Sequence, residues 1–216
     1  MKLQDIKTLI TSGTILLGLA LYFIFADPPP KKVEDTPYQI EQGTATEQTT
    51  SEVKIPAEYA KQATGNELQQ VKFLAANDGD TFSVELDGKK QKVRLLMVDT
   101  TEMNYNKGEP MPYAAEAKAF TEDLLKNAST IELLFDVGPK TDKYDRLLAY
   151  VYVDGVLLQE ALLENGLAVM RYMNKPNNTL EQELRDVQAQ AEASKLNIWA
   201  HEGYFENNQF HVEAVQ

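Results

Sequence analysis

The sequence predicts a mixed α+β domain, a five-stranded β-barrel combined with three helices. Segments rich in alternating and β-branched residues are separated by turn dipeptides, which is typical of short strands. Longer segments between and after them carry apolar residues at helical spacing. The domain, expected at residues 70–203 of the 216-residue chain, is large enough for one core, and without cysteine it holds no disulfide.

The first 27 residues indicate a membrane-targeting segment. Thr8 to Ala26 contains no charge, and at about 1.5 Å per residue such a helix spans a hydrocarbon core of roughly 30 Å. Lys2 and Lys7 precede it and favour a cytoplasmic N-terminus. A cleaved signal peptide is the alternative, but Ile24 is large for the −3 position of a cleavage site. We therefore expect a signal anchor, and a protein secreted or held on the extracellular face of the cell membrane.

Residues 28–69 are expected to form a flexible polar linker. They are rich in Pro, Thr, Gln and Glu, and such a composition buries too little apolar surface to offset the entropy of ordering. A small accessory element around Val53 to Ala60 is an alternative for part of this segment. Residues 204–216 form a C-terminal tail, which either packs on the barrel or extends away from it.

Five strands are expected in the domain. Turn dipeptides follow two of them, and Asp87-Gly88 should join a hairpin. Short strands with helices between and after them are typical of a closed barrel of the OB-fold type. The strands expected are Val71–Ala76, Thr81–Leu86, Lys92–Val98, Thr130–Phe135 and Leu148–Val153.

Three helices accompany the strands. The first, Tyr113–Asn127, follows Pro112, which suits a first helical turn. The second, Leu157–Asn165, ends at Gly166. The third begins at Thr179, which together with Gln182 resembles a capping box, and runs to about Ser194.

The chemistry of the chain must depend on carboxylates. Only two histidines occur, His201 and His211, and both lie outside any motif. A zinc site built on histidine or a Ser-His-Asp triad is therefore improbable. Asp80 follows a glycine-containing turn, and Asp99 ends an apolar strand. With the Thr100 carbonyl they would form an all-oxygen site suited to Ca²⁺ or, less flexibly, Mg²⁺.

Two arginines suggest an anionic ligand near these carboxylates. Arg94 lies within an otherwise apolar strand, where a guanidinium is costly to bury unless an anion pairs with it. That anion is either a structural partner such as Glu102 or a phosphate held by bidentate hydrogen bonds. Arg146 lies in a loop, and alone it would be interpreted as a solvated side chain.

Five motifs follow one another along the chain, and each alone is a weak signal. They are Asp78-Gly79-Asp80-Thr81, Arg94 to Glu102, Thr141 to Arg146, Lys175 to Thr179 and Lys195 to Trp199. In this order and spacing they closely resemble the staphylococcal nuclease (thermonuclease) family. The resemblance covers roughly Gln70 to Trp199.

The resemblance implies a Ca²⁺-dependent phosphodiesterase that acts on DNA and RNA and leaves 3′-phosphate products. It implies metal ligands at Asp80, Asp99 and Thr100, and a water-activating base at Glu102. Arg94 and Arg146 would hold the phosphate. The nucleotide pocket would be lined by Lys143, Tyr144 and Tyr172. We expect a monomer that meets the membrane only through its N-terminal segment.

Three positions depart from the family pattern. Thr101 replaces a usual proline, Asp145 a usual glycine and Asn174 a tyrosine of the nucleotide pocket. We expect these changes to alter affinity or rate without removing the chemistry. Charge is a further departure, since residues 71–203 hold 15 Lys and Arg against 22 Asp and Glu, a net charge of −7. Because nucleic-acid affinity depends on basic residues, we expect modest, metal-dependent binding.

Two other classes of function compete with a nuclease. A non-catalytic OB-fold module that binds single-stranded nucleic acid or protein would typically lack a metal carboxylate or Glu102, and this chain retains them all. A purely structural Ca²⁺-binding module would have no need of Arg94 and Arg146. The sequence therefore favours the nuclease.

Overall fold

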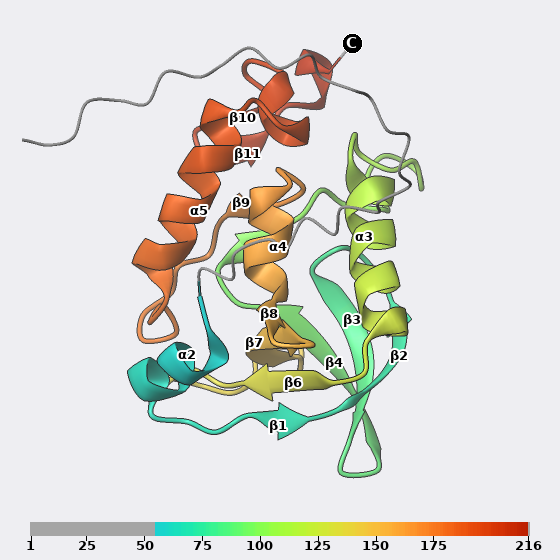
Figure 1. The fold of residues 1–216 in the computed structure, drawn as a ribbon. Coiled ribbons are helices and arrows are strands. Elements are labelled where there is room, and N and C mark those ends of the chain that lie inside the picture. Colours follow the sequence, from blue (N-terminus) through green and yellow to red (C-terminus); the bar gives the residue numbers. More distant parts are fainter. Residues whose placement is uncertain (1–54, 216) are drawn as a thin grey trace, which may run out of the picture. The chain divides into compact units, whose positions relative to one another are not determined.

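The computed structural model describes residues 55–215, which form a mixed α+β domain (Figure 1). The predicted signal anchor or signal peptide, residues 1–27, and the first part of the predicted linker lie outside the described residues. Within residues 55–215, no helix combines the length and apolar character needed to cross a membrane.

The main sheet of the described residues closes on itself. Its order is β1-β6-β7-β4-β3-β2, and β4 and β7 are its parallel pair. Only Val71 separates β1 from β2, so one continuous stretch of chain pairs with β6 at its start and with β3 at its end. This closure is consistent with the predicted OB-type barrel. The segments are β1 (Gln69–Gln70), β2 (Lys72–Ala76), β3 (Thr81–Leu86), β4 (Lys89–Leu95), β6 (Ile131–Leu134) and β7 (Leu147–Val153).

The strand predicted at Lys92–Val98 is divided in the structure. Strand β4 ends at Leu95, and Met97 has a φ of 61°, which turns the chain out of the barrel. The next two residues form β5 (Val98–Asp99), which pairs with β9 (Val169–Met170) in a separate small sheet. This break matters because it carries Asp99 away from the barrel wall and fixes it against a second element.

The two predicted turn dipeptides both form tight hairpin turns. Asp87 and Gly88 have φ values of 51° and 72°, and Leu86 pairs with Lys89 across the turn. Asp154 and Gly155 join β7 to β8 (Val156–Leu157) with φ values of 48° and 85°. Two successive positive φ values define the type I′ turn that Asp-Gly favours.

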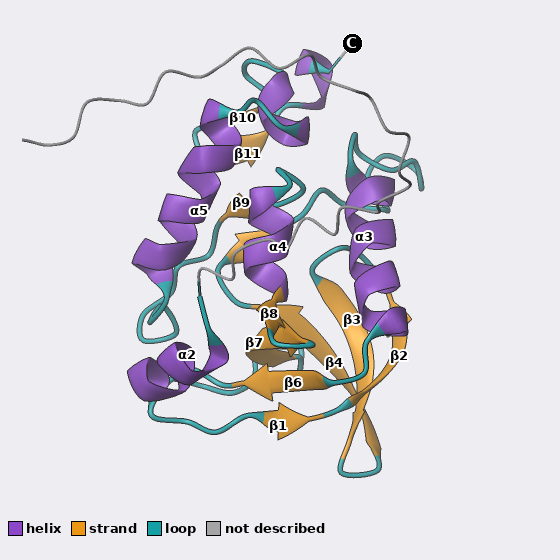
Figure 2. Ribbon diagram, in the orientation of Figure 1, coloured by secondary structure: helices purple, strands orange, loops and turns teal. Residues whose placement is uncertain are grey.

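Four α-helices lie within residues 55–215, and Figure 2 shows α3, α4 and α5 at one side of the strands. The predicted linker reaches residue 69, whereas the structure already forms a helix at residues 57–64. Ile55 is buried and its N–H donates to Glu160 Oε2 at 3.1 Å, so the domain begins earlier than predicted. The helices are α2 (Ala57–Thr64), α3 (Ala114–Asn127), α4 (Leu158–Glu164) and α5 (Glu181–Ala193).

The predicted capping box at Thr179 does not form. The Thr179 N–H donates to Asp136 Oδ2 at 2.9 Å and its hydroxyl donates to Asp136 Oδ1, so the side chain serves a long-range contact instead. Helix α5 starts two residues later, after Leu180. Gly166 does follow the end of α4, with a φ of 61°, and a Cβ there would lie 2.3 Å from the Leu196 carbonyl oxygen.

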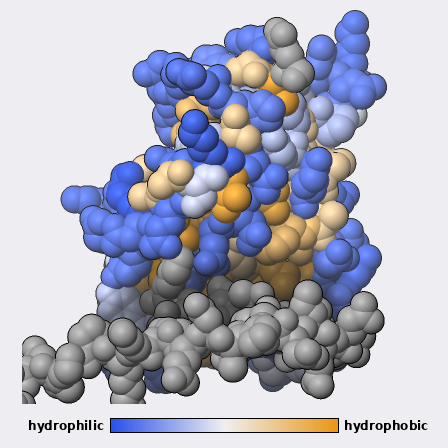
Figure 3. All heavy atoms as spheres, turned by 45° about the horizontal axis from the view of Figure 1, so that its top comes forward, coloured by the Kyte–Doolittle hydropathy of each residue, from blue (hydrophilic) through white to orange (hydrophobic). Residues whose placement is uncertain are grey.

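Residues 204–215 pack on the domain. Tyr204 is fully buried, and its hydroxyl donates to the Pro112 carbonyl at 2.8 Å. Around it lies a second, aromatic core that includes the hairpin of β10 (Phe205–Glu206) and β11 (Gln209–Phe210). The main core fills the barrel with residues such as Phe82, Leu133 and Tyr150. On the face seen in Figure 3, hydrophilic residues predominate, with hydrophobic ones as patches between them.

Candidate active site

Three chain segments bring the predicted metal ligands together. Asp80 is the residue before β3, Arg94 lies opposite Thr81 in β4, and Asp99 ends β5. Gly79 lets the first of these segments pack tightly, since a Cβ there would lie 2.8 Å from both Ala117 Cβ and Thr100 Cγ2. A larger residue here would therefore force the segment next to Asp80, or Ala117 and Thr100, to shift.

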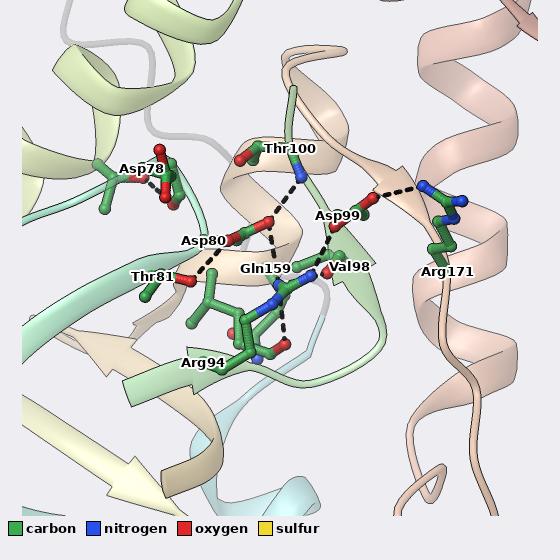
Figure 4. Close-up of polar contacts among 12 residues, drawn as sticks. Asp78, Asp80, Thr81, Arg94, Val98, Asp99, Thr100, Gln159 and Arg171 are labelled. Atoms are coloured by element: carbon green, nitrogen blue, oxygen red, sulfur yellow. Dashed lines mark hydrogen bonds and ion pairs between the residues drawn. The ribbon is translucent and has the colours of Figure 1, made fainter. Parts of the chain in front are cut away.

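Arg94 lies between the two aspartates, as Figure 4 shows. Its Nη1 is 3.0 Å from Asp80 Oδ2, and its Nη2 is 2.6 Å from Asp99 Oδ1. Nη1 also donates to the Val98 carbonyl at 2.8 Å. The second Asp80 oxygen accepts from the Thr81 hydroxyl at 2.9 Å, and Oδ2 accepts from the Thr100 N–H at 2.8 Å. The cluster is therefore held by contacts from both sides of the β4–β5 break.

The sequence left open whether Arg94 pairs with a structural anion such as Glu102. The structure gives it two aspartate partners, Asp80 and Asp99, and Glu102 is not among them. Since both partners are only 8% exposed at their side chains, this is a buried ion cluster. An arginine carries five N–H donors in a fixed fork, so its aspartate bonds leave donors for an additional anion.

Carboxylates are crowded at this site. Burial raises the Asp99 pKa, an effect that Arg94 partly offsets. Burial also raises the pKa of Asp78 and of Glu102, and the charge of Asp80 adds to both shifts. A raised carboxyl pKa means that the ionised form is disfavoured. The positive charge of a bound cation would favour the ionised form again.

The donor atoms present fit a hard cation. Asp80 and Asp99 supply carboxylate oxygens, and the Thr100 hydroxyl is buried without a hydrogen-bond partner in the described part of the chain. Oxygen-only ligands are what Ca²⁺ and Mg²⁺ prefer. Among residues 55–215, however, no three acidic or histidine side chains are placed to hold a metal on their own. A metal here would need backbone oxygens, water or substrate to complete its coordination.

A cavity of about 720 Å³ opens beside the cluster. It is lined by Arg94, Asp99 and Glu102 from the cluster side. The lining also includes Arg146, the third predicted catalytic residue, and the predicted substrate-binding residues Lys143, Tyr144 and Tyr172. The structure thus brings the predicted catalytic and substrate-binding side chains to one cavity, while Asp80 and Thr100 lie buried next to it.

The loop arginine is fixed rather than free. Arg146 Nε donates to Asp142 Oδ2 at 2.8 Å, and Nη2 lies 2.7 Å from the same oxygen. Its guanidinium carbon lies 5.5 Å from the centre of the Tyr144 ring, and Lys143 Nζ lies 4.9 Å from the same ring centre. Tyr144 is nevertheless 67% exposed, so much of this side chain is accessible from solvent.

The three departures from the family pattern have different surroundings. Thr101 is fully buried, and within the described chain its hydroxyl has no hydrogen-bond partner. Asp145 has a φ of 58°, which explains why glycine suits this turn and why an aspartate is tolerated. The carboxylate that pairs with Arg146 is Asp142 and not the adjacent Asp145. Asn174 lines the cavity and adds no ring to it.

One charged neighbour of the site was not predicted. Arg171 follows β9, and its Nη1 donates to Asp99 Oδ2 at 2.8 Å, so arginines contact both Asp99 oxygens. It lies 72 residues from its partner in sequence and belongs to none of the five motifs. The signal that could have identified it is an arginine directly after an apolar segment, next to the predicted pocket residue Tyr172.

We expect Arg171→Met to raise the Asp99 pKa in the metal-free protein. The reason is that Arg171 stabilises the ionised carboxylate through its hydrogen bond and its charge. The measurement is NMR titration of the Asp99 carboxyl carbon. Arg185→Met, which removes an exposed arginine paired with Glu181 on α5, is the matched control and should leave Asp99 unchanged. An Asp99 titration identical in both variants would contradict the assignment.

The structure thus combines a closed barrel, a buried carboxylate–arginine cluster and, beside the cluster, a cavity lined by basic and aromatic side chains. The family model described as staphylococcal nuclease homologue matches residues 92–201. The chain belongs to the staphylococcal nuclease family.

Curated relatives extend the match beyond that segment. Endonuclease YncB of Bacillus subtilis (strain 168) is 36% identical over 207 residues, which cover 94% of this chain and 97% of the relative. SPbeta prophage-derived endonuclease YokF of the same organism is 39% identical over 144 residues, 67% of this chain and 48% of the relative. Thermonuclease of Staphylococcus hyicus is 36% identical over 145 residues, 67% of this chain and 83% of the relative.

Proposed function

We propose that this protein is a Ca²⁺-dependent nuclease that hydrolyses phosphodiester bonds of DNA and RNA to 3′-phosphate products. The observation that carries the proposal is the convergence of Arg94, Asp99 and Glu102 with Arg146 on one cavity. Relatives named as endonucleases and thermonucleases support the same reaction class.

Each side chain has a distinct task in the proposed reaction. Asp80, Asp99 and the Thr100 carbonyl would hold the cation, which supplies electrostatic stabilisation of the phosphate when bound. Glu102 accepts the proton of the attacking water, and its raised pKa brings it closer to the working pH of a general base. Arg94 and Arg146 hold the phosphate oxygens and stabilise the charge that develops on them. The bond to the 5′ oxygen breaks, which leaves the phosphate on the 3′ side.

The cavity wall would select a nucleotide by its shape and charge. Tyr172 is 53% exposed, and the Arg94 guanidinium lies 5.8 Å from its ring centre. A base stacked on Tyr144 or Tyr172 would place its phosphate toward the arginines. Lys143 would neutralise part of the charge of the same nucleotide.

We also propose that the enzyme acts outside the cell, either secreted or tethered to the membrane. The support is sequence alone, namely the uncharged Thr8 to Ala26 segment behind Lys2 and Lys7. Fractionation of cells that express the full chain would test this, because activity confined to the cytosol would contradict it.

We expect the purified protein to digest single-stranded and duplex DNA and RNA in Ca²⁺ and to stop when the metal is chelated. The cation is required because Asp80, Asp99 and Glu102 would otherwise repel the phosphate, and its charge would offset theirs. Gel assays with end-labelled substrates measure the cleavage, and analysis of the new ends identifies 3′-phosphates. Binding without cleavage, across a range of Ca²⁺ concentration and pH, would favour a non-catalytic binding module instead.

A further inference from the structure

Two exposed lysines on strand β4 share a face with Arg94. Pairing between β3 and β4 is continuous from Thr81↔Arg94 to Leu86↔Lys89, without a bulge. Side chains therefore alternate, so that Lys90 and Lys92 project on the same side as Arg94, while Val93 points into the core. The three cations, named here the β4 row, follow one another at intervals of about 6.7 Å.

The row leads directly out of the candidate active site. Arg94 lines the cavity, and its parallel neighbour on β7, Leu148, lines the same cavity. The preceding pair of this parallel ladder is Val93 with Leu147. Lys92, which comes just before Val93, therefore lies toward Arg146, which comes just before Leu147. In Figure 1 the β3–β4 hairpin extends past β1. Lys90 is the second residue of β4, one pair away from the hairpin turn.

Both lysines project from the strand, and their charges are not used within the domain. Among residues 55–215, neither Lys90 nor Lys92 makes an ion pair, although Glu85 lies opposite Lys90. Glu85 is engaged instead by Lys72 at 3.6 Å. Since residues 71–203 carry a net charge of −7, a line of cations that begins at the site is a local exception to the surrounding charge.

A further lysine on this face, Lys72 of β2, lies opposite Glu85 and is paired with it at 3.6 Å, so its charge is already compensated. On the same face of β3 the neighbours of Lys90 and Lys92 are Glu85 and Ser83, which offer a phosphate no positive charge. A single line of cations matches one phosphate backbone, and it does not serve the second strand of a duplex. Lys90 and Lys92 are exposed, whereas Arg94 is buried, so the solvent-accessible part of the row begins next to the site and continues into the hairpin.

We propose that Lys90 and Lys92 bind successive phosphates of a single nucleic-acid strand as it leaves the active site. The inference rests on the proposed function, since it extends the same substrate path. It explains how an acidic protein gathers nucleic acid, because the phosphate contacts that provide most of the affinity are concentrated along one strand. Lys90 and Lys92 position the substrate and take no part in the bond cleavage, which is the task of Arg94 and its neighbours at the site.

The test is the double variant Lys90→Gln/Lys92→Gln, with Lys89→Gln as matched control. Lys89 is exposed on the same hairpin, but alternation places it on the opposite face. The substrate is single-stranded DNA of about 16 nucleotides, the upper range of single-strand site sizes. We expect KM to rise about tenfold at low salt in the double variant. The slope of log affinity against log salt should become shallower by about 1.4, or about 0.7 for each phosphate that is no longer neutralised by a lysine.

Two further measurements separate this inference from the proposed function. The increase in KM should diminish as the DNA is shortened to a dinucleotide, whose single phosphate lies at Arg94 and does not extend to Lys92 and Lys90. Equilibrium binding of the same DNA, followed by fluorescence anisotropy in a Glu102→Gln background, needs no cleavage. A salt slope in the double variant equal to that of Lys89→Gln would overturn the inference, whereas a wild-type protein that binds but never cleaves would overturn the proposed function alone.

Discussion

Replacement of Glu102 by Gln is expected to lower kcat by about 10²–10⁴-fold, the range of general-base catalysis. The amide keeps the size and the hydrogen-bonding capacity of the side chain but does not accept a proton from water. Glu102 lines the cavity beside Arg94 and Asp99, so the change lies where the reaction is proposed to occur. Single-turnover cleavage of labelled DNA measures the rate, and anisotropy measures substrate affinity, which should change little.

The pH dependence of the cleavage rate should also reflect the role of Glu102 as general base. Burial, together with Asp80, Asp78 and Asp99, raises the Glu102 pKa, so its carboxylate protonates at a higher pH than an ordinary glutamate. The rate should therefore rise with pH through the Glu102 pKa, and a bound cation will move that rise to lower pH. In Glu102→Gln this dependence should disappear.

Glu109→Gln is the control for the Glu102 variant. Glu109 is exposed in the same loop, and its backbone exchanges hydrogen bonds with Tyr105 and Asn106. The chemical change is identical, but the cavity is untouched, so activity should be retained. Equal losses of rate and affinity in Glu102→Gln would show that the loop had been displaced, and the assignment of a base would fail.

Sequence alone predicted the barrel strands and three of the helices, because periodicity and turn dipeptides report local structure. Asp87-Gly88 is an example, since the conformation it prefers is the one that the hairpin needs. The early helix α2 was predicted only as the alternative of a small accessory element around Val53 to Ala60, without its helical type. It is short and polar, and the buried Ile55 and its contact with Glu160, 105 residues away, hold its start on the domain.

Motifs predicted which residues lie together at the candidate site, whereas contacts between distant segments were not predicted. Asp80, Arg94 and Asp99 are recognisable by residue type and spacing. After the break at Met97, β5 pairs with β9, which is distant in sequence. No local sequence pattern predicts such a pairing. Arg171 reaches Asp99 only because of this pairing. The capping prediction at Thr179 failed for the same reason, since a distant carboxylate competed with the local partner.

Arg94→Met is the second variant with a large expected effect, and its effect is on stability as well as on rate. Arg94 compensates two carboxylates that are only 8% exposed, so its removal leaves them facing each other. Removing one partner of a buried ion cluster typically costs about 3–5 kcal/mol. We expect the lower end of this range, because Arg171 still contacts Asp99 and the Thr100 N–H still contacts Asp80. Urea unfolding in metal-free buffer measures the destabilisation.

A second substitution distinguishes charge from packing as the cause. Asp80→Asn keeps an oxygen for the Thr100 N–H while it removes one negative charge. If repulsion between Asp80 and Asp99 destabilises Arg94→Met, the double variant Arg94→Met/Asp80→Asn should be more stable than the single one, a non-additive result. Arg185→Met, whose exposed pair with Glu181 should contribute at most about 0.5 kcal/mol, controls for the removal of an arginine. Additive destabilisation would instead mean that Arg94 acts mainly through packing. The negative charges of Asp80 and Asp99, which repel each other, would also attract a cation. The same two charges therefore limit the stability of the metal-free cluster and suit it to hold a metal.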